Sequence, residues 1–300
     1  MRLHNNGCLV NIINAGKSER GYHRLGLASV CLRSYAYTYL DKPKDDADGS
    51  AGSSDGKDSA PLIRGSLLHL GLAHHYAHLS IKKHGFALVN GVRIEDGEEL
   101  LPPIEAVEIE AQRNGILWTG HVPSIVDCLE AYARKWGNDD NWDILGIEHE
   151  YRMRLPTLPR EVSLYTQRAD LVIRERSTGK VWIVDHKSAY MLNGKTAKQY
   201  VLHGQFLGYQ AIGRKEYGRD FGGVLLNRIK INGNEFDRRP SEPAPASVSG
   251  FVRNLVHVEK QILEYLHLPP DAWPGTLHET VCVSKYGECP FFNRCQWGKP

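Results

Sequence analysis

Apolar residues recur along the chain with two different periods, and each period predicts a different kind of element. Spacings of three and four residues indicate helices, whereas short apolar runs bounded by turn-forming residues indicate strands. Helices are expected over residues 27–40, 61–85, 122–137, 196–218 and 247–266. Strands are expected over residues 144–156, 163–175, 180–188 and 222–231. Three strands, a crossover helix and a further strand predict an α/β fold, with a central mixed β-sheet flanked by helices.

The composition agrees with a globular α/β fold and limits the kinds of partner that the protein is expected to bind. Of the 300 residues, 41% are hydrophobic and 24% charged, which is typical of a globular domain. The net charge of +2 does not by itself indicate a polyanionic partner, so a nucleic-acid surface would have to be a local cluster. No apolar run approaches the roughly 18 residues of a membrane span, and the N-terminus lacks a signal-peptide pattern. We therefore expect a cytoplasmic protein, in a cell or an infected host, without a membrane partner.

The chain is expected to form a single domain over residues 1–300. A stretch from 41 to 60 has almost no apolar content and is expected to be a solvated loop. The expected parts are an N-terminal segment (1–60), a helical region (61–146), a core (147–232), and a C-terminal helix with a cysteine-rich tail (233–300).

Ionisable residues stand at the ends of two strands that otherwise look buried, in "ADLVIRERSTGKVWIVDHKSA". These strands are expected to form a β-hairpin. A turn at 177–178 would place Asp170 opposite Asp185, and a turn at 178–179 would place Asp170 opposite Lys187. Because side chains alternate with period two, either register leaves the two carboxylates and the ammonium on one face.

Two carboxylates held this close repel each other unless a cation lies between them. Oxygen ligands suit Mg²⁺ or Mn²⁺, and such an ion can activate water for phosphodiester hydrolysis. The Lys187 ammonium could then orient the water or stabilise charge in the transition state. A surface ion pair at the strand ends remains the alternative.

Further residues can reach the same end of the sheet. Gln205 and Tyr209 are four apart on the helix that follows the hairpin, so they share a face. His69, on the earlier helix, could supply a nitrogen ligand to the metal.

Basic residues surround the Gln205–Tyr209 helix. Lys195 and Lys198, interleaved with Tyr190 and Tyr200, could form a groove that tracks phosphates and stacks bases. A merely solvated face is the alternative.

Together these segments resemble the RecB-like branch of the PD-(D/E)XK nucleases, which includes AddB-type and CRISPR-associated exonucleases and many phage proteins. The matching segments are "RGSLLH", "RAD", "VDHKS" and "GQFLGY", which occur in the family's order between about 61 and 232. The resemblance implies a restriction-endonuclease-like core, and it implies DNA as substrate. It also implies roles for individual residues: His69, Asp170 and Asp185 as metal ligands, Lys187 as the catalytic residue, and Gln205 and Tyr209 positioning the DNA strand.

Three positions before Asp170 stand out. Gln167 occupies a position where the family usually has glycine. Glu148 and Glu150 precede the hairpin and are candidate additional acidic groups, between which the sequence does not choose.

Three of the six cysteines, Cys282, Cys289 and Cys295, lie within fourteen residues at the C-terminus. With a fourth thiolate, they could form a tetrahedral site or hold a cubane cluster, and Cys31 is the best candidate for the fourth. In iron–sulfur members of the resembled branch, one cysteine precedes the core and three follow it. The resemblance thus favours a [4Fe–4S] cluster that acts as a structural staple, with a Zn²⁺ site or unliganded cysteines as alternatives.

The function expected from the sequence is that of a metal-dependent DNA exonuclease that acts at free ends in recombination, repair or phage DNA processing. Asn11 stands where a P-loop needs its first glycine, so a helicase motor would be a separate partner. Two alternatives remain: a catalytically inactive DNA-binding or scaffold subunit with the same fold, and a zinc-stabilised globule whose hairpin charges are incidental.

Overall fold

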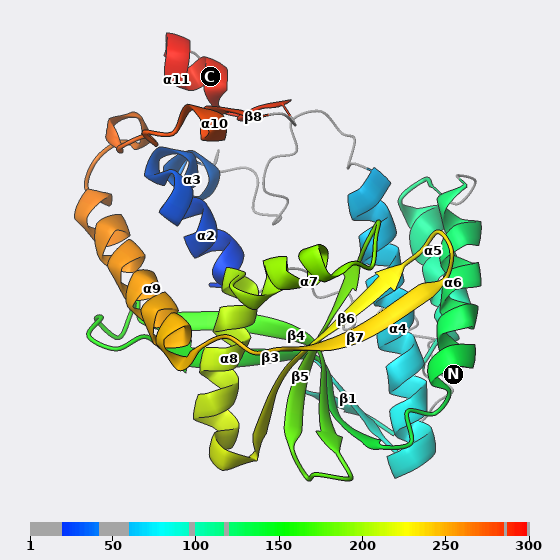
Figure 1. The fold of residues 1–300 in the computed structure, drawn as a ribbon. Helices are drawn as coiled ribbons and strands as arrows, with labels where there is room; N and C mark the ends of the chain where they lie inside the picture. Colours follow the sequence, from blue (N-terminus) through cyan, green and yellow to red (C-terminus); the bar gives the residue numbers. More distant parts are fainter. Residues whose placement is uncertain (1–19, 42–59, 96–99, 117–119, 285–286, 299–300) are drawn as a thin grey trace, which may run out of the picture. The chain divides into compact units, whose positions relative to one another are not determined.

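Figure 1 shows the fold in a computed structural model, which describes residues 20–41, 60–95, 100–116, 120–284 and 287–298. Asn11 and most of the polar stretch 41–60 lie outside these ranges. The contacts divide the chain into two compact units, and the single domain expected from the sequence stays a prediction. Among the described residues, the first unit contains 60–95, 100–116, 120–153 and 166–249, and the second contains 20–41, 154–165, 250–284 and 287–298.

The described residues contain both α-helices and β-strands, as expected of an α/β protein. The α-helices are α2 (Tyr22–Val30), α3 (Leu32–Tyr39), α4 (Ala60–His84), α5 (Pro103–Arg113), α6 (His121–Trp136), α7 (Gly194–Val201), α8 (Gly204–Tyr217), α9 (Pro245–Tyr265), α10 (Glu279–Cys282) and α11 (Phe292–Trp297). The strands are β1 (Ala87–Val89), β2 (Val92–Ile94), β3 (Trp142–Arg154), β4 (Leu164–Glu175), β5 (Val181–Ser188), β6 (Phe221–Lys230), β7 (Glu235–Ser241), β8 (Val283–Ser284) and β9 (Gly287–Glu288).

Seven strands form one mixed sheet in the order β2-β1-β3-β4-β5-β6-β7. The β4–β5 and β6–β7 pairs are antiparallel, and the β5–β6 pair is parallel. A parallel pair needs a crossover, which α7 and α8 provide between β5 and β6. The α/β fold with a central mixed sheet is therefore confirmed.

Helices cover both faces of this sheet (Figure 1). On one face, α4, α5 and α6 enclose a core that includes Leu68, Leu72, Ile125 and Val184. Side chains alternate along β5, so Asp185 points to the opposite face, where Gln205 and Tyr209 of α8 contact it. Strand β5 thus carries the core on one side and the candidate chemistry on the other.

Two expected helices are each interrupted, which corrects the sequence prediction. The helix expected over 27–40 breaks at Cys31, whose backbone is extended (φ −156°, ψ 108°) and whose Sγ accepts a hydrogen bond from Ser34 N at 3.4 Å. The helix expected over 196–218 breaks before α8, where the His203 side chain caps the new helix by accepting from Gln205 N. Local capping by side chains outcompetes continued helix at both points.

Four elements of the first unit were not predicted from the sequence: the strands β1, β2 and β7 and the helix α5. Strands β1 and β2 have only three residues each, and β7 contains Pro240 and many charged residues, so none shows a clear alternating pattern. Pro240 is tolerated because β7 lies at the margin of the sheet. Helix α5 begins at Pro103, and polar residues make up five of its eleven positions.

The second unit is organised around buried aromatic and ionic contacts. Trp273 is fully buried, and its ring lies 5.9 Å from the rings of both Tyr35 and Tyr265. Arg24 donates to the Tyr35 hydroxyl at 2.6 Å and pairs with the buried Glu259. These contacts join α2 and α3 to α9 and to the segment that follows it.

None of the helices in the described ranges combines the length and the apolar character that a bilayer span requires.

Candidate active site

The hairpin brings the two predicted aspartates together in the first of the two expected registers. Leu171 pairs with Val184, so continuation of this register places Asp170 opposite Asp185. This is the register of a turn at 177–178. Asp170 and Asp185 are thus opposite each other at the end of the hairpin, and their role as metal ligands stays a prediction.

Asp185 is fully buried, and three side chains surround its carboxylate. Lys187 Nζ lies 2.5 Å from Oδ1 and is itself only partly exposed. On the other oxygen, Gln205 Nε2 donates to Oδ2 at 2.8 Å, and the Tyr209 hydroxyl lies 3.0 Å away. The same hydroxyl lies 2.6 Å from the carbonyl oxygen of Arg168, so its single proton serves either acceptor.

Asp170 is held from two directions. The backbone N–H of His186 donates to its Oδ2 at 2.6 Å, and His69 Nδ1 lies 3.4 Å from the same oxygen. Burial alone would raise the pKa of Asp170, but the His69 imidazolium and the Lys187 ammonium outweigh it and hold the pKa well below its usual range. Asp170 is therefore a carboxylate throughout the physiological pH range.

The two aspartates also shift the pKa values of the other ionisable groups of the site. Burial raises the pKa of Asp185, and Asp170 adds to this effect while Lys187 opposes it. Burial would lower the pKa of His69, but Asp170 reverses this and raises it to about 9. The pKa of Lys187 is likewise raised, because Asp185 and Asp170 outweigh the desolvation of its ammonium. Without a cation, two positive side chains balance the carboxylates.

Glu148 is the third acidic group of this site. The sequence alone did not distinguish it from Glu150. Burial and the neighbouring Asp170 raise the pKa of Glu148 to about 8, and Asp185 acts in the same direction. Glu150 instead pairs with Arg152 at 3.1 Å and with Arg168 at 3.7 Å. The structure therefore places Glu148, and not Glu150, among the catalytic candidates.

A backbone irregularity explains why the alternation of β3 does not reveal this. Glu148 has φ +49°, a conformation that non-glycine residues adopt infrequently. Before it, Ile147 belongs to the core under α4, whereas Tyr151 after it hydrogen-bonds Tyr217 of α8 at 2.8 Å. The strand therefore changes face between Ile147 and Tyr151, and a regular period-two alternation does not extend across Glu148.

Gln167 has a structural use at the position where a glycine is usual. Its Nε2 donates to the backbone oxygen of Gln205 at 2.5 Å, which fixes the first turn of α8 against β4. The missing glycine thus leaves the paired aspartates in place.

His186, between Asp185 and Lys187, faces the opposite side of the sheet. Its Nδ1 accepts a hydrogen bond from Asn227 Nδ2 at 2.7 Å, and its ring stacks on Tyr76 with centroids 5.7 Å apart. Burial lowers its pKa to about 3, so the ring is neutral. His186 is a packing residue and not a fourth ligand.

The donor set fits a hard divalent cation. Two carboxylates, with a third nearby, are ligands that suit Mg²⁺ or Mn²⁺, and the His69 imidazole would join them once it has lost its proton. Asp185 Oδ1 is buried, and the ion pair with Lys187 is the contact that it makes among the described residues. In the described ranges no three His, Cys, Asp or Glu side chains are arranged closely enough to hold an ion as they stand. The ligand set His69, Asp170 and Asp185 therefore stays a prediction.

The residues predicted to contact DNA fall into two groups. Lys195 and Lys198 are exposed on α7, as a phosphate-binding role requires. Tyr209 is fully buried and holds Asp185, so its expected direct contact with a DNA strand is not what the structure shows. Gln205 is partly buried and also contacts Asp185, which makes both residues candidates for orienting that carboxylate.

The four predicted cluster cysteines lie near one another in the second unit. Burial raises the pKa of the Cys289 thiol, and the nearby thiols of Cys295, Cys31 and Cys282 each raise it further. Cys289 N donates to Cys282 O at 2.7 Å, which closes a short loop between these two cysteines. The thiols are free, and they stand outside ligating distance of a shared ion.

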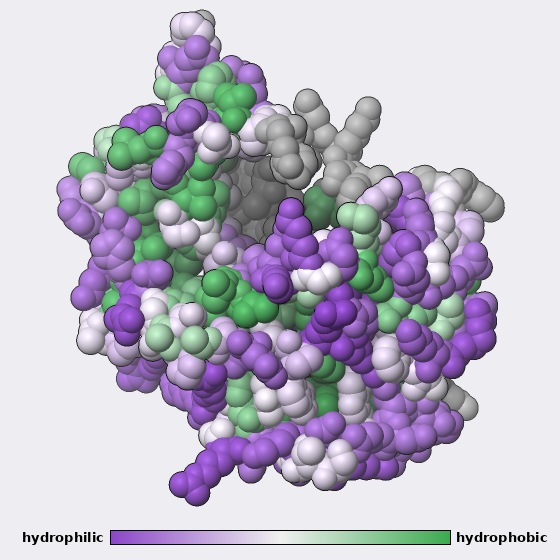
Figure 2. All heavy atoms as spheres, viewed as in Figure 1, coloured by the Kyte–Doolittle hydropathy of each residue, from purple (hydrophilic) through white to green (hydrophobic). Residues whose placement is uncertain are grey.

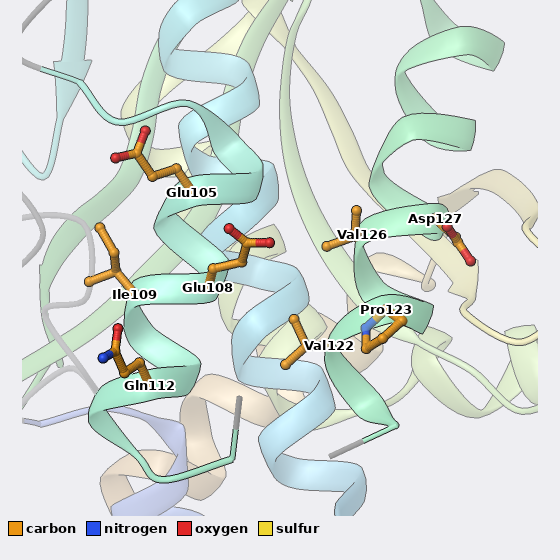
Figure 3. A pocket seen from close by; sticks show the side chains of 8 residues that line it. All are labelled: Glu105, Glu108, Ile109, Gln112, Val122, Pro123, Val126 and Asp127. Atoms are coloured by element: carbon orange, nitrogen blue, oxygen red, sulfur yellow. The ribbon is translucent and has the colours of Figure 1, made fainter. Parts of the chain in front are cut away.

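A cavity of about 610 Å³ lies apart from these residues, between α5 and α6 (Figure 3). Ile109, Val122 and Val126 form apolar walls, and the carboxylates of Glu105 and Glu108 stand beside them. None of the candidate catalytic residues lines it, and its acidic groups would repel phosphates. The hairpin site, and not this cavity, is the candidate active site.

Comparisons with known proteins agree with this geometry. The family model described as the PD-(D/E)XK nuclease superfamily matches residues 22–296. No curated protein matches the sequence. A solved structure titled "Crystal structure of SSO0001" is similar over 55% of this chain and 70% of its own, with 16% identity and a TM-score of 0.31, a likeness too slight to bear on the fold or the function.

Proposed function

Because the chain belongs to the PD-(D/E)XK nuclease superfamily, whose members are metal-dependent nucleases, we propose that it is a deoxyribonuclease that removes nucleotides from DNA ends. The observation that carries this proposal is the register that places Asp170 opposite Asp185, with Lys187 paired to the latter. The resemblance of four motifs to RecB-like exonucleases favours action at free ends. Recombination, repair and phage DNA processing are roles that fit, with any helicase as a separate partner.

His69, Asp170 and Asp185 would hold the Mg²⁺ or Mn²⁺, and Glu148 would lie beside them. When bound, the ion supplies Lewis acidity at the phosphoryl group. Lys187 Nζ, beside Asp185 Oδ1, is the cation that this chain offers to the developing negative charge on phosphorus oxygens. Its raised pKa keeps it protonated at neutral pH, so it acts as a fixed positive charge or as a hydrogen-bond donor.

The surrounding residues fix the positions of the carboxylates. Gln205 and Tyr209 restrict Asp185 through Oδ2, and the His186 N–H restricts Asp170. Such second contacts orient metal ligands, and their loss typically costs about 10- to 100-fold in metal affinity or activity.

We further propose that Cys31, Cys282, Cys289 and Cys295 hold a [4Fe–4S] cluster, with Zn²⁺ as the alternative occupant. Support comes from the proximity of the four thiols and from protein contacts that hold the C-terminal segment near α3. Arg294, next to Cys295, pairs with Asp271 at 3.1 Å, and its guanidinium lies 4.0 Å from the ring centroid of Tyr37. Metal analysis of anaerobically purified protein separates the two metals. Cys289→Ala should lose the metal, whereas Cys128→Ala, at a buried thiol of the first unit, should retain it.

The nuclease proposal is tested with end-labelled linear single- and double-stranded DNA and with closed circular DNA, each with Mg²⁺, Mn²⁺ or a chelator. We expect metal-dependent degradation of linear DNA and survival of circular DNA. Asp185→Asn should lower the rate by at least about 100-fold, and Glu150→Gln, a matched change outside the site, should not. Equal and negligible cleavage by wild type and Asp185→Asn, with DNA binding retained, would instead support an inactive DNA-binding subunit.

A further inference from the structure

Two exposed side chains, one aromatic and one a thioether, lie just after the strand that carries Asp185 and Lys187. Tyr190 is 87% exposed and Met191 is 52% exposed, on the segment between β5 and α7. Large apolar side chains this exposed lose the stabilisation that burial would give them, so a contact with a ligand is one reason to keep them on the surface. Around the position of α7 in Figure 1, the surface in Figure 2 shows apolar and hydrophilic side chains side by side.

The segment that displays them is anchored at both ends. Ala189 N donates to Ile229 O at 2.8 Å, which continues the pairing of β5 with β6. At the other end, the fully buried Arg228 donates to Asn193 O and to the Thr196 hydroxyl, each at 2.7 Å. Because both ends are tied, Tyr190 is presented from a fixed backbone, which reduces the entropy lost when a ligand stacks on its ring.

This segment adjoins the catalytic residues. Tyr190 follows Lys187 by three residues, which at strand spacing is a reach of about 10 Å. The next helix also returns to the site, because Tyr200 is among the groups that raise the pKa of Lys187. The segment that carries Tyr190 therefore lies next to the carboxylate site along the chain.

The positive charge of α7 suits a nucleic-acid strand as ligand. Its sequence "GKTAKQYV" contains Lys195 and Lys198, both exposed, and no acidic residue. A cationic helix beside an exposed aromatic ring is the combination that binds single-stranded nucleic acid, where lysines follow the phosphates and rings stack the bases. In a continuous duplex the bases are stacked on one another, and their faces are closed to such a ring.

We propose that Tyr190 and Met191 form a stacking platform for an unpaired base of the strand held at the catalytic carboxylates, so that this site takes single-stranded or frayed DNA. The inference rests on the proposed nuclease function and names its substrate class. Lys195 and Lys198 contact the phosphates that flank the stacked base. Loss of one base–aromatic contact is expected to weaken binding by about 5- to 150-fold.

The test compares kinetics on single-stranded oligonucleotides for wild type, Tyr190→Ala and Tyr190→Phe. Tyr190→Ala should raise KM by about tenfold with little change in kcat, and Tyr190→Phe should retain the wild-type KM because stacking needs the ring and not the hydroxyl. Val92→Ala, an exposed apolar change on the opposite marginal strand β2, is the matched control and should change nothing.

A second measurement reports the stacking itself. A fluorescent 2-aminopurine placed along the oligonucleotide should be quenched by wild type at one position and not by Tyr190→Ala. An abasic nucleotide at that position should weaken binding to wild type and leave Tyr190→Ala unaffected. If Tyr190→Ala cleaves single strands with unchanged KM and equal quenching, the platform is refuted and the nuclease stands, even where the ring proves to bind a partner protein. If wild type cleaves no DNA with either metal, the proposed function and the platform both fail.

Discussion

Replacing Tyr209 by phenylalanine removes one hydroxyl from the site and keeps the buried ring. That hydroxyl lies 3.0 Å from Asp185 Oδ2 and 2.6 Å from Arg168 O, and it accepts from Gln205 Nε2 at 3.0 Å. Because the ring is fully buried and unchanged in shape, the variant tests the hydroxyl without opening a cavity. If the hydroxyl orients the carboxylate, its loss should appear in metal binding and in kcat.

The size of the effect follows from the contacts that remain. A hydrogen bond to a charged group contributes about 1.5–3 kcal/mol, which corresponds to about 10- to 150-fold. Gln205 still donates to the same Oδ2 at 2.8 Å, so the carboxylate keeps one of its two restraints on that side. We therefore expect the lower end, a loss of about tenfold in Mn²⁺ affinity or in kcat.

Calorimetric titration with Mn²⁺ in the absence of DNA measures the first quantity, and single-turnover cleavage measures the second. Tyr217→Phe is the matched control, because its hydroxyl pairs with Tyr151 at 2.8 Å, away from the carboxylates. A Tyr209→Phe protein with unchanged Mn²⁺ affinity and unchanged single-turnover rate would refute the orienting role, as would an equal loss in Tyr217→Phe.

Three further predictions concern stability. Arg238→Met leaves the buried Asp139 without its ion pair and should lower the free energy of unfolding in urea by about 3–5 kcal/mol; a loss below 1 kcal/mol would contradict this. In metal-free protein, the pKa of Glu148 is raised to about 8, so its stabilising contribution is complete below the unfolded value near 4.5 and disappears as pH rises through 8. Thermal unfolding with a chelator should show this decline between pH 5 and about 9, and Glu148→Gln should flatten it; an identical slope in the variant would exclude Glu148 as its source. Gly213→Ala places a Cβ about 2.2 Å from the Phe221 ring and should cost about 1–3 kcal/mol, whereas an unchanged melting temperature would show that the ring moves freely.

The parts of the site that the sequence predicted correctly depend on short-range periodicity. The shared face of Asp170, Asp185 and Lys187 follows from the period-two alternation in either of the two expected registers, and the shared face of Gln205 and Tyr209 follows from the four-residue spacing on a helix. Neither inference needs knowledge of distant packing. The same reasoning placed α4 within one residue of its observed ends, since Gly85, at φ +78°, ends the helix.

The parts that it missed depend on contacts between distant segments. The choice of Glu148 over Glu150 follows from a positive φ in β3, and such a backbone irregularity leaves no mark in the residue pattern. Tyr209 was expected to contact DNA. Its spacing from Gln205 predicts that the two residues share a helix face, but it does not predict which part of the protein or ligand that face contacts. The break at Cys31 arises from a single extended residue, whose cost is offset by its sulfur capping the next helix.

Strand β5 shows why chemistry and stability meet at this site. Asp185 and Lys187 point to the α8 face, while His186 between them points to the α4 face and is buried against Tyr76. From His186 a buried chain of hydrogen bonds runs through Asn227 to the Tyr132 hydroxyl, and it continues to Tyr76, Asp139 and Arg238.

A buried polar network becomes costly when it loses some of its hydrogen bonds. These hydrogen bonds therefore hold β5 in one register against α4 and α6. A slip of one residue would exchange the faces of His186 and the two catalytic candidates, burying an ion pair in an apolar core. The buried, neutral His186 inside the Asp-x-Lys motif therefore helps to fix which face of the sheet carries Asp185 and Lys187.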